Sequence, residues 1–278
     1  MRHVRIAGVC LLAIFALTAT VSASASAGTL PALWECHKLT ANKITKKFEG
    51  IYTDTKCSKE ATTKQKEEGL VNKFVLQEFS LAAKKNKPKE FKDLKGAGAD
   101  LAIEGVATVA CASFEDHGFF SGPKTANKIK VTFFGCEIAG LKCSNTEIAG
   151  KVETKTLTGE LGYISGKGTE HPVVGAVIRP ETGIYEAEFR CQDLHLRVHG
   201  SVIGKVEVPL KTFTTKATLY FKESGGKQSP EQFEEGVKET LITETCKSEE
   251  FCEPGGTPDP SAEEAKAINT GELLELLA

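Results

Sequence analysis

Apolar and polar residues alternate one by one in several short runs of this chain. Odd positions are apolar and even positions polar over 128–133, and the same period of two recurs over 185–191, 194–199 and 217–222. A period of two is typical of strands that bury one face, and strands with one wet face belong to antiparallel sheets. We therefore expect an all-β protein. Further candidate strands lie at 101–111, 150–157, 161–164, 173–178, 202–210, 238–245 and 272–277.

The number and spacing of these runs indicate how the strands assemble. About ten short strands separated by turn residues are typical of an antiparallel β-sandwich or barrel, with Greek-key-like or meander connections. Helical signals are few: Thr63 is the candidate cap of a short helix through Glu68, ended by Gly69, and Ser261 caps a candidate second helix over 263–267. With 40% hydrophobic and 26% charged residues, the chain can bury a core.

The first 27 residues have the pattern of a secretory signal peptide. Arg2 and Arg5 precede an apolar run over 6–18, and small residues follow as far as Ala25-Ser26-Ala27. The run is shorter than the roughly 20 residues that span a bilayer. We therefore expect cleavage near Ala27, export to the extracellular space and no membrane span afterwards. One β-rich domain should remain over 28–278, with a Lys-rich part at 28–98, a strand core at 99–245 and an acidic loop and C-terminal strand at 246–278.

Charge is distributed unevenly along the chain and bears on its partners. Residues 28–99 carry 15 Lys against 9 acids, whereas residues 223–278 carry 4 Lys against 14 acids. A basic segment can bind an anionic polymer. Here the lysines are interleaved with Glu and Thr and have few aromatic neighbours for base stacking, so we expect no nucleic-acid partner. A cell-surface or extracellular polymer remains an open partner class.

Cysteine usage points to an oxidising compartment. Without Cys10 in the apolar run, eight cysteines remain, and an even number in an exported chain predicts disulfides. Their spacing does not fit a zinc knuckle, and no metal or cofactor is expected. Eight cysteines allow 105 connectivities, which the sequence does not decide. Local spacing and elimination favour Cys36–Cys57, Cys136–Cys143, Cys246–Cys252 and Cys111–Cys191.

Most segments that resemble catalytic or ligand-binding motifs lack the spacing or the residues that the chemistry needs. The segments 162–167 and 200–205 look like phosphate loops, but each is one residue short and lacks the Ser or Thr after Lys. His195 and His199 lie too far apart along a strand to share a metal, about 13 Å at 3.3 Å per residue. Asp116 and His117 are expected in a turn at the surface.

One pair of acids is the best catalytic candidate that the sequence offers, although the support for it is weak. Glu186 and Glu188 should share a strand face about 6.6 Å apart, within the range of the paired carboxyls of glycosidases. Against this, the polar face of that strand offers no aromatic platform for a sugar. A solvated face is the simpler interpretation, so replacing both by Gln should change stability by less than about 0.5 kcal/mol. The sequence thus predicts a secreted, non-catalytic binding or structural protein of unknown ligand, with a carbohydrate-active hydrolase using Glu186 and Glu188 as the alternative.

A set of short motifs, most of them with Cys, Gly or an aromatic residue, is spread over the chain after residue 28. They are Trp34-Glu35-Cys36, Tyr52-x-Asp54-x-x-Cys57, Thr108-Val109-Ala110-Cys111-Ala112-Ser113, Gly122-Pro123-Lys124, Phe134-Gly135-Cys136, Gly140-x-x-Cys143, Gly159-x-Leu161-Gly162-Tyr163-Ile164, Phe189-x-Cys191 and Gly200-Ser201-Val202-Ile203-Gly204. Together these motifs resemble an uncharacterised family of exported bacterial proteins. The resemblance implies that the cysteines up to Cys191 form a shared framework and that Cys246 and Cys252 are a pair peculiar to this chain. It implies no activity, so no functional residue is carried over.

Overall fold

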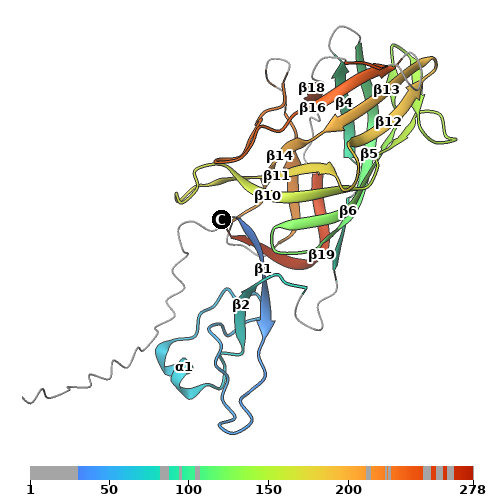
Figure 1. The fold of residues 1–278 in the computed structure, drawn as a ribbon. Helices are drawn as coiled ribbons and strands as arrows, with labels where there is room; N and C mark the ends of the chain where they lie inside the picture. The colour runs from blue at the N-terminus through green and yellow to red at the C-terminus, as the bar shows by residue number, and fades with distance from the viewer. Residues whose placement is uncertain are drawn as a thin grey trace, which may run out of the picture.

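The computed structural model describes residues 31–81, 88–93, 96–103, 107–210, 214–222, 224, 227–246, 252–254, 259–261 and 266–277. In this part of the chain, one short helix accompanies antiparallel strands, which confirms the expected all-β class (Figure 1). The elements, in chain order, are β1 Ala32–Lys38, α1 Thr63–Glu68, β2 Phe74–Glu78, β3 Lys89–Asp93, β4 Gly96–Ile103, β5 Ala107–Phe120, β6 Thr125–Phe134, β7 Glu137–Ile138, β8 Leu141–Ser144, β9 Lys151–Glu153, β10 Leu157–Ser165, β11 Val173–Pro180, β12 Tyr185–Cys191, β13 Leu194–Gly200, β14 Val202–Glu207, β15 Thr214–Tyr220, β16 Leu241–Cys246, β17 Cys252–Pro254, β18 Asp259–Ser261 and β19 Lys266–Leu277.

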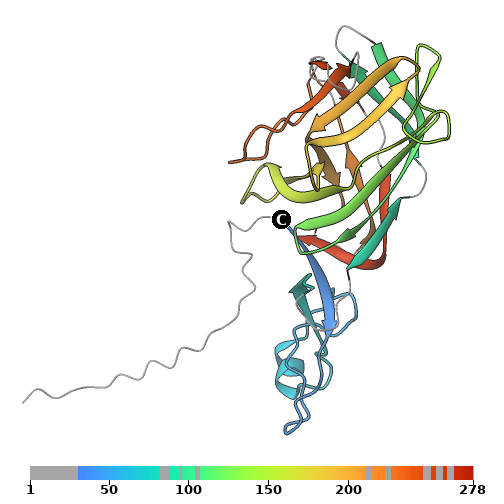
Figure 2. The same cartoon turned by 45° about the vertical axis from the view of Figure 1, so that its right-hand side comes forward.

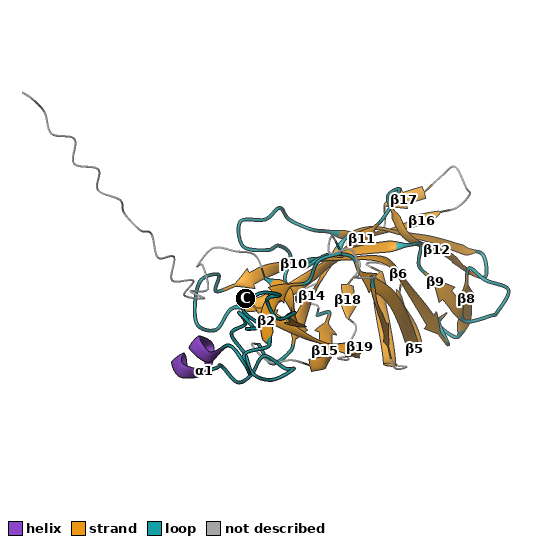
Figure 3. Ribbon diagram, turned by 90° about the horizontal axis from the view of Figure 1, so that it is seen from below, coloured by secondary structure: helices purple, strands orange, loops and turns teal. Residues whose placement is uncertain are grey.

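The main sheet curves around an interior. Its neighbours follow the order β3, β5, β6, β10, β11, β14, β15 and β19, and β19 then pairs with β3. That last contact is short, because only Ile268 with Asp93 and Asn269 with Lys92 are paired across it. Figure 3, seen from below, shows these strands arranged around the interior. The sheet is thus strongly curled and only narrowly joined where its two ends meet.

A second layer covers one end of the curled sheet. It consists of β8, β12, β13, β16 and β17, which lie at the top of Figure 1. Its inner face packs against the main sheet in a sandwich-like arrangement, and the side chains that meet there form the largest buried cluster. The members from the second layer are Cys143, Ala187, Phe189, Cys191, Leu196, Val198 and Leu241, and those from the strands beneath it include Ile103, Val109, Ile138 and Val152.

The N-terminal part, 31–81, lies beyond the other end of the curled sheet (Figures 1 and 2). It contains β1, α1 and β2, and β1 ties it to the sheet by pairing with the end of β19. The short helix has the predicted extent, but Thr62 and not Thr63 caps it: the Thr62 hydroxyl accepts from the backbone N–H of Gln65. Gly69 ends the helix in the left-handed conformation, as the sequence indicates.

Five predicted runs from the middle of the chain lie wholly within strands, whether or not their residues alternate strictly. The runs 128–133, 161–164, 173–178, 185–191 and 194–199 lie within β6, β10, β11, β12 and β13.

Two runs predicted as single strands are each divided. The run 101–111 is divided between β4, which ends at Ile103, and β5, which begins at Ala107, and 150–157 is divided between β9 and β10. β4 and β5 form a hairpin, whereas β9 and β10 both pair with β6 and are separated by a short break. In neither case does the apolar pattern of the sequence mark the interruption. The second predicted helix falls mostly at 262–265, outside the described residues, and Lys266 and Ala267 belong to β19.

One of the four predicted cysteine pairs is confirmed and two are contradicted. Cys36–Cys57 is confirmed, but the structure joins Cys111 to Cys136 and Cys143 to Cys191. The predictions Cys111–Cys191 and Cys136–Cys143 are therefore wrong.

The layout of the strands explains this exchange of partners. The β7–β8 hairpin does bring its two cysteines close, since the Cys143 N–H donates to the Cys136 carbonyl at 2.9 Å. However, Cys143 lies directly opposite Cys191 across the β8–β12 ladder, and β7 pairs with β5, which carries Cys111. Cys246 is also disulfide-bonded and lies opposite Cys252 across the β16–β17 ladder, but the side chain of Cys252 is outside the described residues.

Candidate ligand cavity

Two adjacent cavities occupy the interior. The larger cavity, about 200 Å³, lies between the curled sheet and the second layer, and the smaller cavity, about 120 Å³, lies toward β1 and β19. Asp116, Ile129, Ile178 and Leu219 line both cavities, so the two spaces share a wall. The sequence pattern predicts the apolar faces that surround them, but not that these faces leave space between them.

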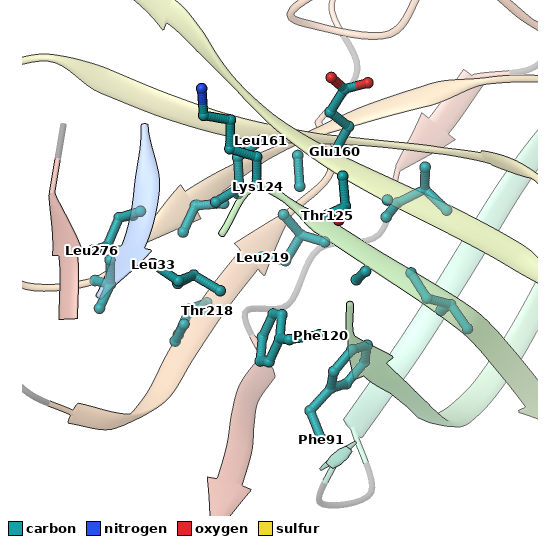
Figure 4. A pocket seen from close by; sticks show the side chains of 18 of the residues that line it. Leu33, Phe91, Phe120, Lys124, Thr125, Glu160, Leu161, Thr218, Leu219 and Leu276 are labelled. Carbon is teal, nitrogen blue, oxygen red and sulfur yellow. The ribbon is translucent and has the colours of Figure 1, made fainter. Parts of the chain in front are cut away.

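The smaller cavity is closed in by apolar side chains from distant parts of the chain. In Figure 4, Leu33, Phe120, Leu219 and Leu276 converge from β1, β5, β15 and β19 on a common space. Lys124 and Glu160 are at its rim, and their charged ends point away from the apolar cluster (Figure 4). These two charged groups are therefore not directed at a ligand in this space.

A β-bulge at the start of β12 turns an acid into the larger cavity. Tyr185 pairs with His199 and Ala187 with the next residue, Val198, so Glu186 is an extra residue in the ladder. A bulge breaks the alternation of side chains between the two faces. Tyr185 consequently lies on the outer face, 5.4 Å from the Arg197 guanidinium, whereas Glu186 and Ala187 both line the larger cavity. The prediction that Glu186 faces solvent beside Glu188 is wrong for this reason.

Glu186 is an acid in an almost entirely apolar setting. Glu186 is only 8% exposed, and its Oε1 is buried without a hydrogen-bond partner among the described residues. Its backbone carbonyl accepts the N–H of Lys155 at 2.7 Å, which holds β12 against the end of β9. Burial raises the pKa of Glu186 to about 8, because a carboxylate loses its hydration there. In the empty cavity the carboxyl is therefore mainly protonated at neutral pH.

Glu188 lies on the opposite face of the same strand and is fully engaged. Arg197 Nε donates to its Oε1 at 2.8 Å, and His195 Nε2 lies 2.9 Å from the same oxygen. The Arg197 guanidinium is the largest cause that holds the pKa of Glu188 below its ordinary value. The two acids thus face different spaces, and the geometry of a paired-carboxyl glycosidase is not present.

The other histidines and acids singled out in the sequence are distributed over separate sites. Asp116 and His117 lie inside β5 and not in a turn, and Asp116 lines both cavities. His195 and His199 contact different acids, since His199 Nε2 lies 3.2 Å from Glu244. Within the described ranges no group of three or more His, Cys, Asp or Glu side chains is placed to hold a metal ion.

The phosphate-loop-like segment 162–167 already binds an anion of the chain itself. The backbone N–H groups of Gly166 and Lys167 donate to the two carboxylate oxygens of Glu234, each at 2.9 Å. The Lys167 ammonium contacts Glu235 at 2.7 Å. The turn therefore anchors the loop that contains Glu234 and Glu235, and this explains its Gly-Lys composition without an external phosphate.

Comparison with protein-family models, with curated proteins and with solved structures finds no match for this chain. The resemblance to an exported bacterial family therefore stays a prediction. No helix in the described part of the chain is long and apolar enough to cross a membrane.

Proposed function

We propose that this protein is a secreted, non-catalytic binding protein that holds a small apolar molecule in its larger cavity. One observation carries the proposal: an apolar space of about 200 Å³ is lined by Glu186, whose Oε1 is buried without a hydrogen-bond partner among the described residues. Ligand sites in proteins are typically concave and apolar, with a small number of polar groups that orient the ligand. An interior space of this kind suits a small molecule better than the extracellular polymer that the sequence left open.

The disulfides support the proposed location. Cys36–Cys57, Cys111–Cys136 and Cys143–Cys191 are all bonded, and such bonds persist in oxidising compartments outside the cytoplasm. Together with the signal-like segment before residue 28, they favour a protein that meets its ligand after export.

Titration with the neutral fluorophore N-phenylnaphthylamine tests the proposal. We expect the purified, disulfide-bonded protein to bind one molecule per chain, with enhanced fluorescence. Ala187→Phe should abolish this binding, because Ala187 is only 7% exposed and lines the larger cavity. Val237→Phe is the matched control, since it adds the same ring at a position that is 76% exposed.

Circular dichroism shows whether each variant has the same fold as the wild type. If Ala187→Phe does not fold, Ala187→Leu replaces it and should weaken binding. Absence of fluorophore binding by the wild type, or unchanged binding by a folded cavity-filling variant, would overturn the proposal.

A further inference from the structure

We infer that the ligand of the larger cavity is an amphiphile with one basic amine, and that its ammonium group pairs with the Glu186 carboxylate. This inference rests on the proposed binding function and adds the chemical class of the ligand. It starts from the geometry of Glu186: the bulge in β12 places this acid in the cavity, although regular alternation would have placed it in water.

The unpartnered oxygen is the first argument. A buried polar group normally has a hydrogen-bond partner, and each exception needs an explanation. Glu186 Oε1 is buried and has no partner among the described residues, although the residue is only 8% exposed. The missing partner is therefore expected from outside the chain, and it must be a donor if the carboxyl is ionised.

The charge of the lining is the second argument. Asp100, Asp116 and Glu186 line the larger cavity, and among its described lining residues there is no Lys, Arg or His. Asp100 is exposed, so the acidic lining extends from the solvent to the interior. In a low-dielectric space, a buried acid with no base among the described lining residues favours a cation over a neutral or anionic group, and Glu186 is such an acid. The smaller cavity differs, because Lys124 and Lys216 are among the residues around it. We therefore place the ammonium at Glu186 and the apolar tail along the wall that the cavities share.

The pH dependence of affinity distinguishes an amine from a neutral ligand. The pKa of Glu186 is about 8 without a ligand, and an adjacent ammonium would lower it. Below pH 8 the carboxyl must release its proton to the solvent when the amine binds, so affinity for an amine falls as pH falls. A ligand with a neutral acceptor needs the protonated carboxyl instead, so its affinity would fall as pH rises above 8. Among the described lining residues, the other titratable groups are Asp100 and Asp116. The side chain of Lys155, whose backbone N–H donates to the Glu186 carbonyl, is exposed.

Octylamine and octanol form a matched pair of probes, because they share one alkyl chain and differ in the head group. Each is used to displace N-phenylnaphthylamine from the wild-type protein between pH 6 and pH 9. We expect octylamine to bind about a hundredfold more tightly at pH 9 than at pH 6, the change that proton linkage gives for a carboxyl of pKa about 8. Octanol should bind more weakly than octylamine at pH 9.

Two variants locate the effect. Glu186→Gln should remove the pH dependence and weaken octylamine binding at pH 9 by roughly tenfold or more, since it removes one partner of a buried charge pair. Glu188→Gln changes the same residue type on the other face of β12 and should retain the tight, pH-dependent binding of octylamine.

The outcomes separate this inference from the proposed function. If the fluorophore binds but octylamine has no advantage over octanol, or if its affinity does not rise with pH, the amine inference is overturned and the binding function stands. Tighter binding of octanol with a loss above pH 8 would also overturn it and would indicate a neutral acceptor ligand. If neither the fluorophore nor the octyl compounds bind, the proposed function itself fails.

Discussion

Replacing Glu186 by Gln should stabilise the protein in a pH-dependent way. Burial raises the pKa of this carboxyl from its ordinary value of 4.5 to about 8. Between these two values the folded protein holds a proton that the unfolded chain has lost, so the free energy of unfolding falls as pH rises. At about 1.4 kcal/mol for each pKa unit, the wild type should lose about 3 to 4 kcal/mol between pH 5 and pH 8 through this one group. Gln fills a similar volume without a charge and should not show that loss.

Denaturant unfolding of wild type and variant, with the disulfides intact, measures the effect at intervals from pH 5 to pH 9. We expect the two proteins to have similar stability at pH 5 and the variant to be more stable by about 3 kcal/mol at pH 8. This replaces the expectation from sequence that Gln at both positions is nearly neutral. Parallel pH profiles for the two proteins would show that Glu186 is not a buried acid and would refute the assignment.

Glu188→Gln serves as the control of opposite sign. The Arg197 guanidinium lowers the pKa of Glu188. At a pH above the ordinary pKa of a Glu, the ionised carboxylate therefore stabilises the folded protein, and this contribution is lost as pH falls through the lowered pKa. The variant should therefore be less stable than wild type at neutral pH and approach it in acid. Glu188 is partly exposed, and solvent screening should keep this effect smaller than that of Glu186.

Two further predictions concern the scaffold. Peptide mapping without reduction should recover Cys143–Cys191, and its replacement by Ala at both positions should cost up to about 4 kcal/mol, because it closes a longer loop than the other two described bonds; recovery of a different partner for Cys143 would contradict the fold. Gly200→Ala should cost about 3 kcal/mol or more by thermal unfolding, since Gly200 has φ +108° and a Cβ there would collide with the carbonyl oxygen of Thr240. Gly140→Ala, at φ +81° with nothing within 4 Å of its Cβ, should cost only about 1 kcal/mol; equal losses at the two glycines would contradict the predicted clash.

The sequence predicts which side chains share a face well where the strand has no bulge, so that each residue pairs with one residue of the neighbouring strand. Ile129, Val131 and Phe133 alternate in the sequence, and all three line the larger cavity from β6. The same reasoning fails for Tyr185 and Glu186, because a bulge adds one residue to the ladder and exchanges the faces on its N-terminal side. No local residue pattern marks this bulge, since its position depends on how β12 meets β13.

Neither the disulfide pairing nor the cavity could be predicted from the sequence, and the reason is related. Both depend on which strands become neighbours, and that is a long-range property. Cys136 and Cys143 are close in sequence but bond to Cys111 on β5 and Cys191 on β12. The larger cavity likewise combines residues from both layers, from β4 in the main sheet to Leu241 in β16. Composition and periodicity describe each strand separately and contain little information about such pairings.

The anchoring of β12 explains why the buried acid cannot simply turn outward. At one end of the strand, Cys191 is bonded to Cys143 and paired with it across the β8–β12 ladder. In the middle, Glu188 is held on the outer face by Arg197, and next to the bulge the Lys155 N–H holds the carbonyl of Glu186. Rotation of Glu186 into water would need the removal of the bulge, which would shift the register of a strand fixed on both sides. The protein can therefore relieve the charge of Glu186 in only two ways, by binding a proton or by binding a cation, and the pH dependence of stability and of amine affinity measure these two processes separately.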